Sequence, residues 1–310
     1  MLTSGADLTA EEVARRVGAS TADVLAIWRT LGLPGRPGER AFSEADAELV
    51  RGILSLQQFR GYEGDELLRV MGGALGRVAE AAVAVYVQTV ETTMMDAGAS
   101  LVERARDNAA TASMALQIGG AMGTLFAHHV RAAIDRQRLA QTGVAERTLM
   151  RLAVGFVDLV GFTPRARQLP PRQLLEVITG LESRAFELAA EHGGRVVKHI
   201  GDEIMFVALD ARAACDVALA LMHGLADAGG APHGGLSFGE VLTRHGDYYG
   251  PVVNLASRLA DEAIPGEVLV DEAVAGAAVG EGVAFEPAGR RLLKGFRDPV
   301  PVSSLLAEAS

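Results

Sequence analysis

The chain has 310 residues and carries 39 acidic against 29 basic side chains, which gives a formal charge of −10. Hydrophobic residues make up 49% of it, so the composition excludes a disordered chain and allows a globular core. The acidic balance argues against nucleic-acid binding and against binding to anionic membranes. A single cysteine, Cys215, excludes an internal disulfide framework and favours the reducing cytoplasm.

Lysine and asparagine are unusually scarce. The only lysines are Lys198 and Lys294, and the only asparagines are Asn108 and Asn254. In a chain that otherwise uses arginine, a retained lysine can mark a site that needs a compact ammonium group. Chance within a biased composition explains the same count equally well.

The first half predicts an all-helical domain over residues 1–141, followed by a linker over 142–150. Thr9, Ser20 and Ser43 each precede acidic residues by two or three positions, a pattern typical of helix N-termini. Two longer helices are expected over about 64–97 and 100–139. The N-terminus lacks the pattern of a secretory signal, and the uncharged run 109–127 has too much Ala, Gly, Ser and Thr for a transmembrane helix.

The second half, residues 151–310, predicts an α+β domain. The pattern gives a strand at 154–159, a helix at 171–192, a hairpin of strands at 196–200 and 204–207, and a helix at 211–226. A strand at 235–242, a helix at 252–262 and a strand at 267–270 follow. This is the ferredoxin-like β-α-β-β-α-β order.

Two aspartates of this domain are expected to form a metal site. Asp158 ends the first strand and Asp202 lies at the tip of the hairpin, and the ferredoxin-like order makes these segments neighbours. Two carboxylates suit Mg²⁺, with substrate phosphates and water as the remaining ligands. The backbone N–H groups of Gly161, Phe162 and Thr163 could cradle a triphosphate. The alternative is that Asp202 is only a turn residue and Asp158 only an approach to the next helix.

Three segments of the second half closely resemble the signatures of class III nucleotide cyclases: FVDLVGFT at 156–163, VVKHIGDEIMF at 196–206 and GDYYGPVVNLASRL at 246–259. The resemblance covers residues 150–305 in order and spacing. It implies a homodimer with active sites at the interface and two Mg²⁺ or Mn²⁺ ions in each site. One chain would supply the metal ligands, matching Asp158 and Asp202. The other would supply purine-contacting and transition-state residues, matching Lys198, Asp247, Asn254 and Arg258.

The chemistry of two matched residues favours ATP as substrate. Adenine offers an acceptor at N1 and a donor at its amine, and the pair Lys198/Asp247 offers a donor and an acceptor. Guanine has a donor at N1 and an acceptor at O6, so its donor would face the Lys198 donor and its acceptor would face the Asp247 acceptor. Asn254 and Arg258 lie four residues apart on one helix face, where the amide can orient the ribose and the guanidinium can contact the reacting phosphate. Lys294 lies where the family often has a lysine for the terminal phosphate, although the match is loose there.

Other functions are weighed against an adenylate cyclase. Gly201-Asp202-Glu203 faintly resembles the diguanylate cyclase hairpin, but the other segments do not belong to that pattern. A catalytically weak nucleotide-binding signalling module remains the alternative, although such degenerate cyclases usually lose a metal aspartate or the Asn/Arg pair. Residues 11–32 resemble the start of a MerR-like DNA-binding domain, but their mixed charge gives no basic stripe.

The first half resembles the helical regulatory domains of actinobacterial, mycobacterial-type cyclases that respond to pH. The resemblance implies autoinhibition of the catalytic domain. His128 and His129 are candidates for the titrating groups, with surface histidines of no role as the alternative. In that family the helical domain can also bind a fatty acid. Met-rich helices could form such a pocket, although these methionines would more often be core: Met94, Met95, Met114 and Met122.

Overall fold

The computed structural model describes residues 7–33, 38–55, 62–91, 94, 97–98, 100–140, 149–226, 231–278 and 282–307. It divides into two compact units, residues 1–129 and 130–310. The helix α6 crosses this division. Most of the expected linker at 142–150 lies outside the described residues, and Leu149 and Met150 of that range belong to the first strand.

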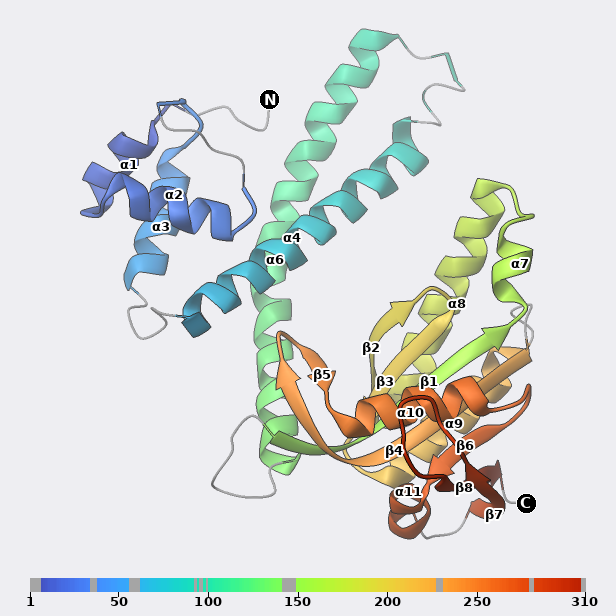
Figure 1. The fold of residues 1–310 in the computed structure, drawn as a ribbon. Helices are drawn as coiled ribbons and strands as arrows, with labels where there is room; N and C mark the ends of the chain where they lie inside the picture. Colours follow the sequence, from blue (N-terminus) through green and yellow to red (C-terminus); the bar gives the residue numbers. More distant parts are fainter. Residues whose placement is uncertain are drawn as a thin grey trace. The chain divides into compact units, whose positions relative to one another are not determined.

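The first unit is helical, as the sequence predicts (Figure 1). Its helices are α1 (Ala10–Val17), α2 (Thr21–Thr30), α3 (Glu44–Ser55), α4 (Tyr62–Tyr86), the π-helical turn η2 (Val87–Glu91) and the part of α6 (Leu101–Ala140) before residue 130. Thr9 and Ser20 close capping boxes with Glu12 and Asp23, and Ser43 bonds reciprocally with Asp46. These caps satisfy the free N–H groups that begin α1, α2 and α3.

A small core holds the first three helices together. Trp28 stacks at a tilt on Phe42 with their ring centroids 4.7 Å apart, and a single bridge joins Leu8 to Phe42. The helices α4 and α6 are long, and no helix among the described residues is both long and apolar enough to cross a membrane.

The second unit is built on one sheet. Its strands are β1 (Leu149–Val160), β2 (Gly194–Ile200), β3 (Glu203–Ala208), β4 (Ala231–Arg244), β5 (Asp247–Tyr249), β6 (Val268–Asp271), β7 (Val283–Arg291) and β8 (Val300–Ala307). Its complete helices are α7 (Phe162–Ala166), α8 (Pro171–Glu191), α9 (Ala211–Gly224), α10 (Pro251–Glu262) and α11 (Glu272–Ala277). The strand order is β2-β3-β1-β4-β6-β8-β7, with β5 paired to β4.

The ferredoxin-like core is confirmed by this order. The strands β2, β3, β1 and β4 are antiparallel neighbours, and β1 lies between β3 and β4. The predicted helices and strands are all present, but β1 and β4 extend several residues beyond their predicted ends. The sequence patterns did not predict β5, α11, β7 or β8.

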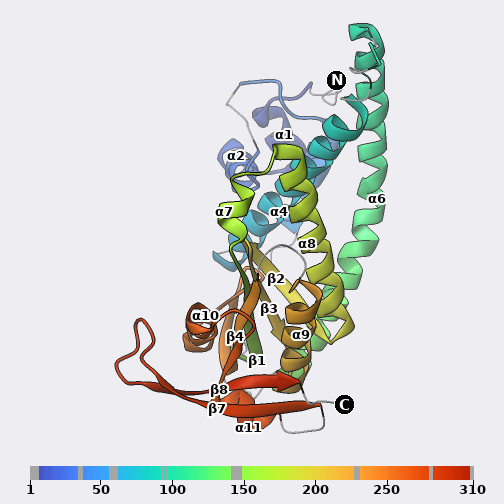
Figure 2. The same cartoon turned by 90° about the vertical axis from the view of Figure 1, so that its right-hand side faces the viewer.

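Helices cover both faces of the sheet, as Figure 2 shows with the sheet seen near its edge. One face packs on α8 and α9 through alternate β1 residues such as Val157 and Leu159. The other packs on α10 through Val154 and Phe156. Since side chains alternate along a strand, Asp158 belongs to the α10 face.

The helix α10 lies very close to the sheet. It crosses β4 at Gly235, where an added Cβ would lie 2.3 Å from the Ala260 nitrogen and 2.4 Å from the Ala256 oxygen. A glycine is therefore required for the close approach. The approach fixes the position of the helix that carries Asn254 and Arg258.

Candidate active site

The two predicted metal ligands come to the same edge of the sheet. Asp158 lies near the end of β1, and Asp202 lies in the turn that joins β2 to β3. Val157 of β1 pairs with Ile204 of β3, so the residues just beyond this pair meet where the turn begins. Residues 44 positions apart in the chain are brought together by the antiparallel pairing of β1 and β3.

This edge carries a concentration of negative charge. Glu203, the first residue of β3, has its pKa raised to about 7, chiefly by burial and then by the charges of Asp158, Asp261 and Asp202. In contrast, the pKa of Asp158 is lowered, chiefly by its contact with His233. Glu203 and His233 were not predicted as site residues; the position of Glu203 directly after Asp202 was the only sequence signal for either.

The carboxylates fit a divalent cation that takes further ligands from elsewhere. Oδ1 of Asp158 is buried and has no hydrogen-bond partner, so it is available as a hard oxygen ligand. Among the described residues, no group of three or more His, Cys, Asp or Glu side chains could hold a metal ion by itself. A cation here would therefore need oxygens from a substrate or from water.

Lys198 and Asp247 form an ion pair. Lys198 lies on β2 opposite Met205, and Asp247 begins β5, where it also accepts a hydrogen bond from the Tyr248 N–H at 2.9 Å. The Lys198 Nζ donates to Oδ2 of Asp247. The two residues that were matched to purine contacts therefore meet in one chain, although 49 positions separate them.

A second contact between β2 and β5 lies beside this pair. The Arg195 guanidinium donates to the Tyr248 hydroxyl at 2.9 Å, and its carbon lies 5.6 Å from the centroid of the Tyr248 ring. Arg136, near the end of α6 in the same unit, has its pKa lowered by burial and then by the charge of Arg195. Ala140 packs in the core on the α10 face. The end of α6 thus lies against strands that carry Lys198 and Asp247.

A pocket of about 350 Å³ unites three other predicted residues. Asn254 and Arg258 line it from α10, and Lys294 lines it from the loop between β7 and β8. Its other lining residues are Pro251, Gly295 and Phe296. Asp158 and Asp202 do not line this pocket as far as the described residues define it. Arg258 also donates to Asp261 at 2.5 Å.

The remaining predicted residues follow β1. The Phe162 side chain is buried in the core on the α8 and α9 face, so only its backbone N–H is left to contact a substrate. Gly161 has φ +88°, a conformation that glycine adopts without strain. The side chain of Thr163 lies outside the described residues.

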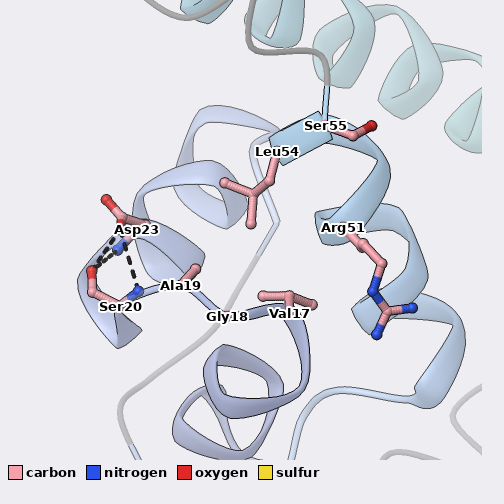
Figure 3. Close-up of a pocket in the computed structure, with 8 residues that line it drawn as sticks. All are labelled: Val17, Gly18, Ala19, Ser20, Asp23, Arg51, Leu54 and Ser55. Atoms are coloured by element: carbon pink, nitrogen blue, oxygen red, sulfur yellow. Dashed lines mark hydrogen bonds between the residues drawn. The ribbon is translucent and has the colours of Figure 1, made fainter.

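A larger cavity of about 470 Å³ lies in the helical unit (Figure 3). It is lined where α1 ends, α2 begins and α3 ends. Ser20 bonds to Asp23, and Arg51 pairs with Glu48 and donates to the Arg16 carbonyl at 3.2 Å. These polar side chains of the cavity therefore already form hydrogen bonds or ion pairs within the protein.

Comparison with known proteins identifies the family of the second unit. Residues 144–303 match the model of the adenylate and guanylate cyclase catalytic domain. An uncharacterised protein of Mycobacterium tuberculosis is 33% identical over 310 residues, covering 94% of this chain and 77% of that protein. An adenylate cyclase of Streptomyces coelicolor is 32% identical over 270 residues, covering 85% of this chain and 70% of that protein.

A further relative is a pH-sensitive adenylate cyclase of Mycobacterium tuberculosis. It is 33% identical over 156 residues, which cover 48% of this chain and 39% of that protein. The family match spans the whole ferredoxin-like core and the predicted site residues on it. The chain therefore belongs to the adenylate and guanylate cyclase family, and its second unit is a class III cyclase domain.

Proposed function

We propose that this chain is an adenylate cyclase that converts ATP to 3′,5′-cyclic AMP and pyrophosphate. The observation that carries the choice of substrate is the ion pair between Lys198 and Asp247. It places one donor and one acceptor side by side, the pattern complementary to the N1 and amine edge of adenine. Relatives named adenylate cyclase support the same choice.

Each of these side chains contacts a different part of the substrate. Lys198 and Asp247 hold the base, and Asn254 orients the ribose so that its 3′-OH faces the α-phosphate. Arg258 neutralises charge that develops on that phosphate in the transition state. Lys294, in the same pocket, contacts the outer phosphates.

Asp158 and Asp202 hold the divalent cations, Mg²⁺ or Mn²⁺, with the backbone of residues 161–163 close to the triphosphate. Bound at these carboxylates, two such ions would lower the pKa of the attacking hydroxyl and neutralise the leaving oxygens. The buried, unpartnered Oδ1 of Asp158 supports this role.

We also propose that the active site forms between two copies of the chain. Asn254, Arg258 and Lys294 share a pocket, and neither metal-binding aspartate is among the residues described as lining it. In a homodimer, the aspartates of one copy would face this pocket of the other. Isologous pairing then gives two identical sites.

Cyclic AMP formation tests the proposed activity directly. We expect the purified full chain to form cyclic AMP from ATP with Mn²⁺, and Asp158→Asn or Asn254→Ala to reduce kcat at least 100-fold, the usual cost of a lost transition-state contact. Arg172→Lys, an exposed exchange on α8, is the control. Nucleotide binding without product in the unsubstituted chain would instead support the nucleotide-binding signalling module.

The helical unit is proposed to regulate this activity in response to pH. Within the second unit, the end of α6 carries Arg136, which is close enough to Arg195 and Tyr248, beside the base-binding pair, to interact electrostatically with them. A relative of the chain is pH-sensitive. His128 and His129 are exposed on α6 and are the proposed pH-responsive groups.

This regulation is tested in the full chain by His128→Asn/His129→Asn. If the two histidines sense pH, the double variant loses a pH-dependent change of kcat that the parent shows between about pH 5 and 8. Unchanged profiles would exclude them.

A fatty-acid ligand has no support: the cavity of the helical unit has paired polar groups, and the side chains of Met95 and Met114 lie outside the described residues.

A further inference from the structure

A buried histidine lies directly opposite the predicted metal ligand of β1. His233 of β4 is only 7% exposed, and it is the cross-strand partner of Asp158 in the β1–β4 pairing. Its Nε2 lies 3.7 Å from Oδ2 of Asp158, and its Nδ1 lies 2.9 Å from the carbonyl oxygen of Ala260. The imidazole therefore bridges β1 and α10.

The contact with Ala260 determines the orientation of the His233 ring. A carbonyl oxygen only accepts, so Nδ1 carries a hydrogen and donates it to Ala260. Nε2 is then directed at the Asp158 carboxylate. A ring held by a helix carbonyl on one side can keep its other nitrogen in a constant position.

The two oxygens of Asp158 have different surroundings. Oδ2 faces His233, whereas Oδ1 is buried without a partner. The imidazole contacts one oxygen and leaves the other for a cation.

The helix end of this bridge lies on α10, whose Asn254 and Arg258 belong to the second site of the proposed homodimer. Ala260 is two residues beyond Arg258 and six beyond Asn254 on α10. Gly235, two residues along β4 from His233, is where this helix touches the sheet. A shift of α10 would therefore move the ring, and the ring would move against Asp158.

We propose that His233 is a positioning residue that aims Oδ1 of Asp158 at the divalent cation and ties this carboxylate to the helix carrying Asn254 and Arg258. The proposal rests on the proposed function, because it assumes that Asp158 binds the metal. The competing explanation is that His233 only fastens β4 to α10 through Ala260.

Two substitutions distinguish these explanations, because each preserves one end of the bridge. In His233→Gln the amide nitrogen can take the place of Nε2, beside Asp158. In His233→Asn it can take the place of Nδ1, beside Ala260. The positioning role predicts that Gln preserves metal binding and Asn does not, and a fastening role predicts the reverse.

The measurement is Mn²⁺ binding to the full chain with a non-cyclisable ATP analogue, followed by electron paramagnetic resonance of the free ion. We expect the dissociation constant of Mn²⁺ to rise about 10- to 100-fold in His233→Asn and by much less in His233→Gln. In turnover assays, the half-saturating Mn²⁺ concentration should follow the same order. Equal losses in both variants, or the reverse order, would overturn the proposal.

Three controls keep the result interpretable. Thermal unfolding of both variants shows whether either has lost its fold. His192→Asn alters a histidine with a similar contact, its Nδ1 lying 3.0 Å from the Leu188 carbonyl at the end of α8, and should leave Mn²⁺ binding unchanged. Asp158→Asn must abolish the binding. If it does not, the metal site of the proposed function is wrong; if it does while both His233 variants bind normally, only the positioning role fails.

Discussion

Lys198 and Asp247 together match the hydrogen-bonding pattern of adenine. A single change, Lys198→Glu, removes the donor and sets two carboxylates side by side. We expect kcat/KM for ATP to fall about 10- to 100-fold, since a hydrogen bond to a charged group contributes about 1.5–3 kcal/mol. Cyclase assays with ATP and GTP measure this change, with Arg172→Lys as control. An unchanged kcat/KM for ATP would mean that the pair does not read the base.

The thiol of Cys215 should be unreactive in the folded protein. It is completely buried, and burial raises its pKa to about 12. Because only the thiolate reacts with disulfide reagents, we expect dithionitrobenzoate to leave the native chain unmodified. One equivalent should react at once in guanidinium chloride. Rapid labelling of the native chain would show that α9 opens readily.

At the scale of elements, the position of α10 depends on Gly235. A Cβ there would collide with the backbone of Ala256 and Ala260, so Gly235→Ala should push the helix away from the sheet. We expect the free energy of unfolding to fall by about 1–3 kcal/mol, as in other overpacked cores. Cyclase activity should fall more steeply, because the helix carries Asn254 and Arg258.

A matched control for this prediction is available in α8. Gly180 lies inside that helix, and an added Cβ would have no atom within 4 Å. Gly180→Ala should raise the free energy of unfolding by about 0.5–1 kcal/mol, because alanine is the better helix former. Chemical denaturation measures both variants. Equal effects of the two substitutions would contradict the close contact at Gly235.

At the scale of the whole molecule, a site shared between two copies predicts complementation. Asp158→Asn and Asn254→Ala each inactivate one half of every site. If the variants exchange subunits freely, half of the dimers are mixed, and each mixed dimer has one intact site of two. We expect about a quarter of the unsubstituted activity on mixing. Activity that stays at the level of the separate variants would show that each copy builds its own site.

Much of this protein follows from its sequence. The capped helices of the first unit, the ferredoxin-like strand order and the family are readable from local patterns, because helix caps, turn residues and apolar periodicity each report on a few neighbouring residues. The scarce lysines and asparagines now have locations: Lys198 contacts Asp247, and Asn254 and Lys294 line one pocket. The side chain of Asn108 lies outside the described residues.

The tertiary structure decided which of these residues meet. The sequence patterns predict no strand at Asp247, but it lies in β5, where the β4–β5 hairpin brings it to Lys198. His233 had no sequence signal, because its partners Asp158 and Ala260 are 75 positions before it and 27 after it. Contacts across such separations depend on strand pairing and on the close approach of α10 at Gly235. Local patterns in the sequence cannot encode them, and the folded sheet creates them.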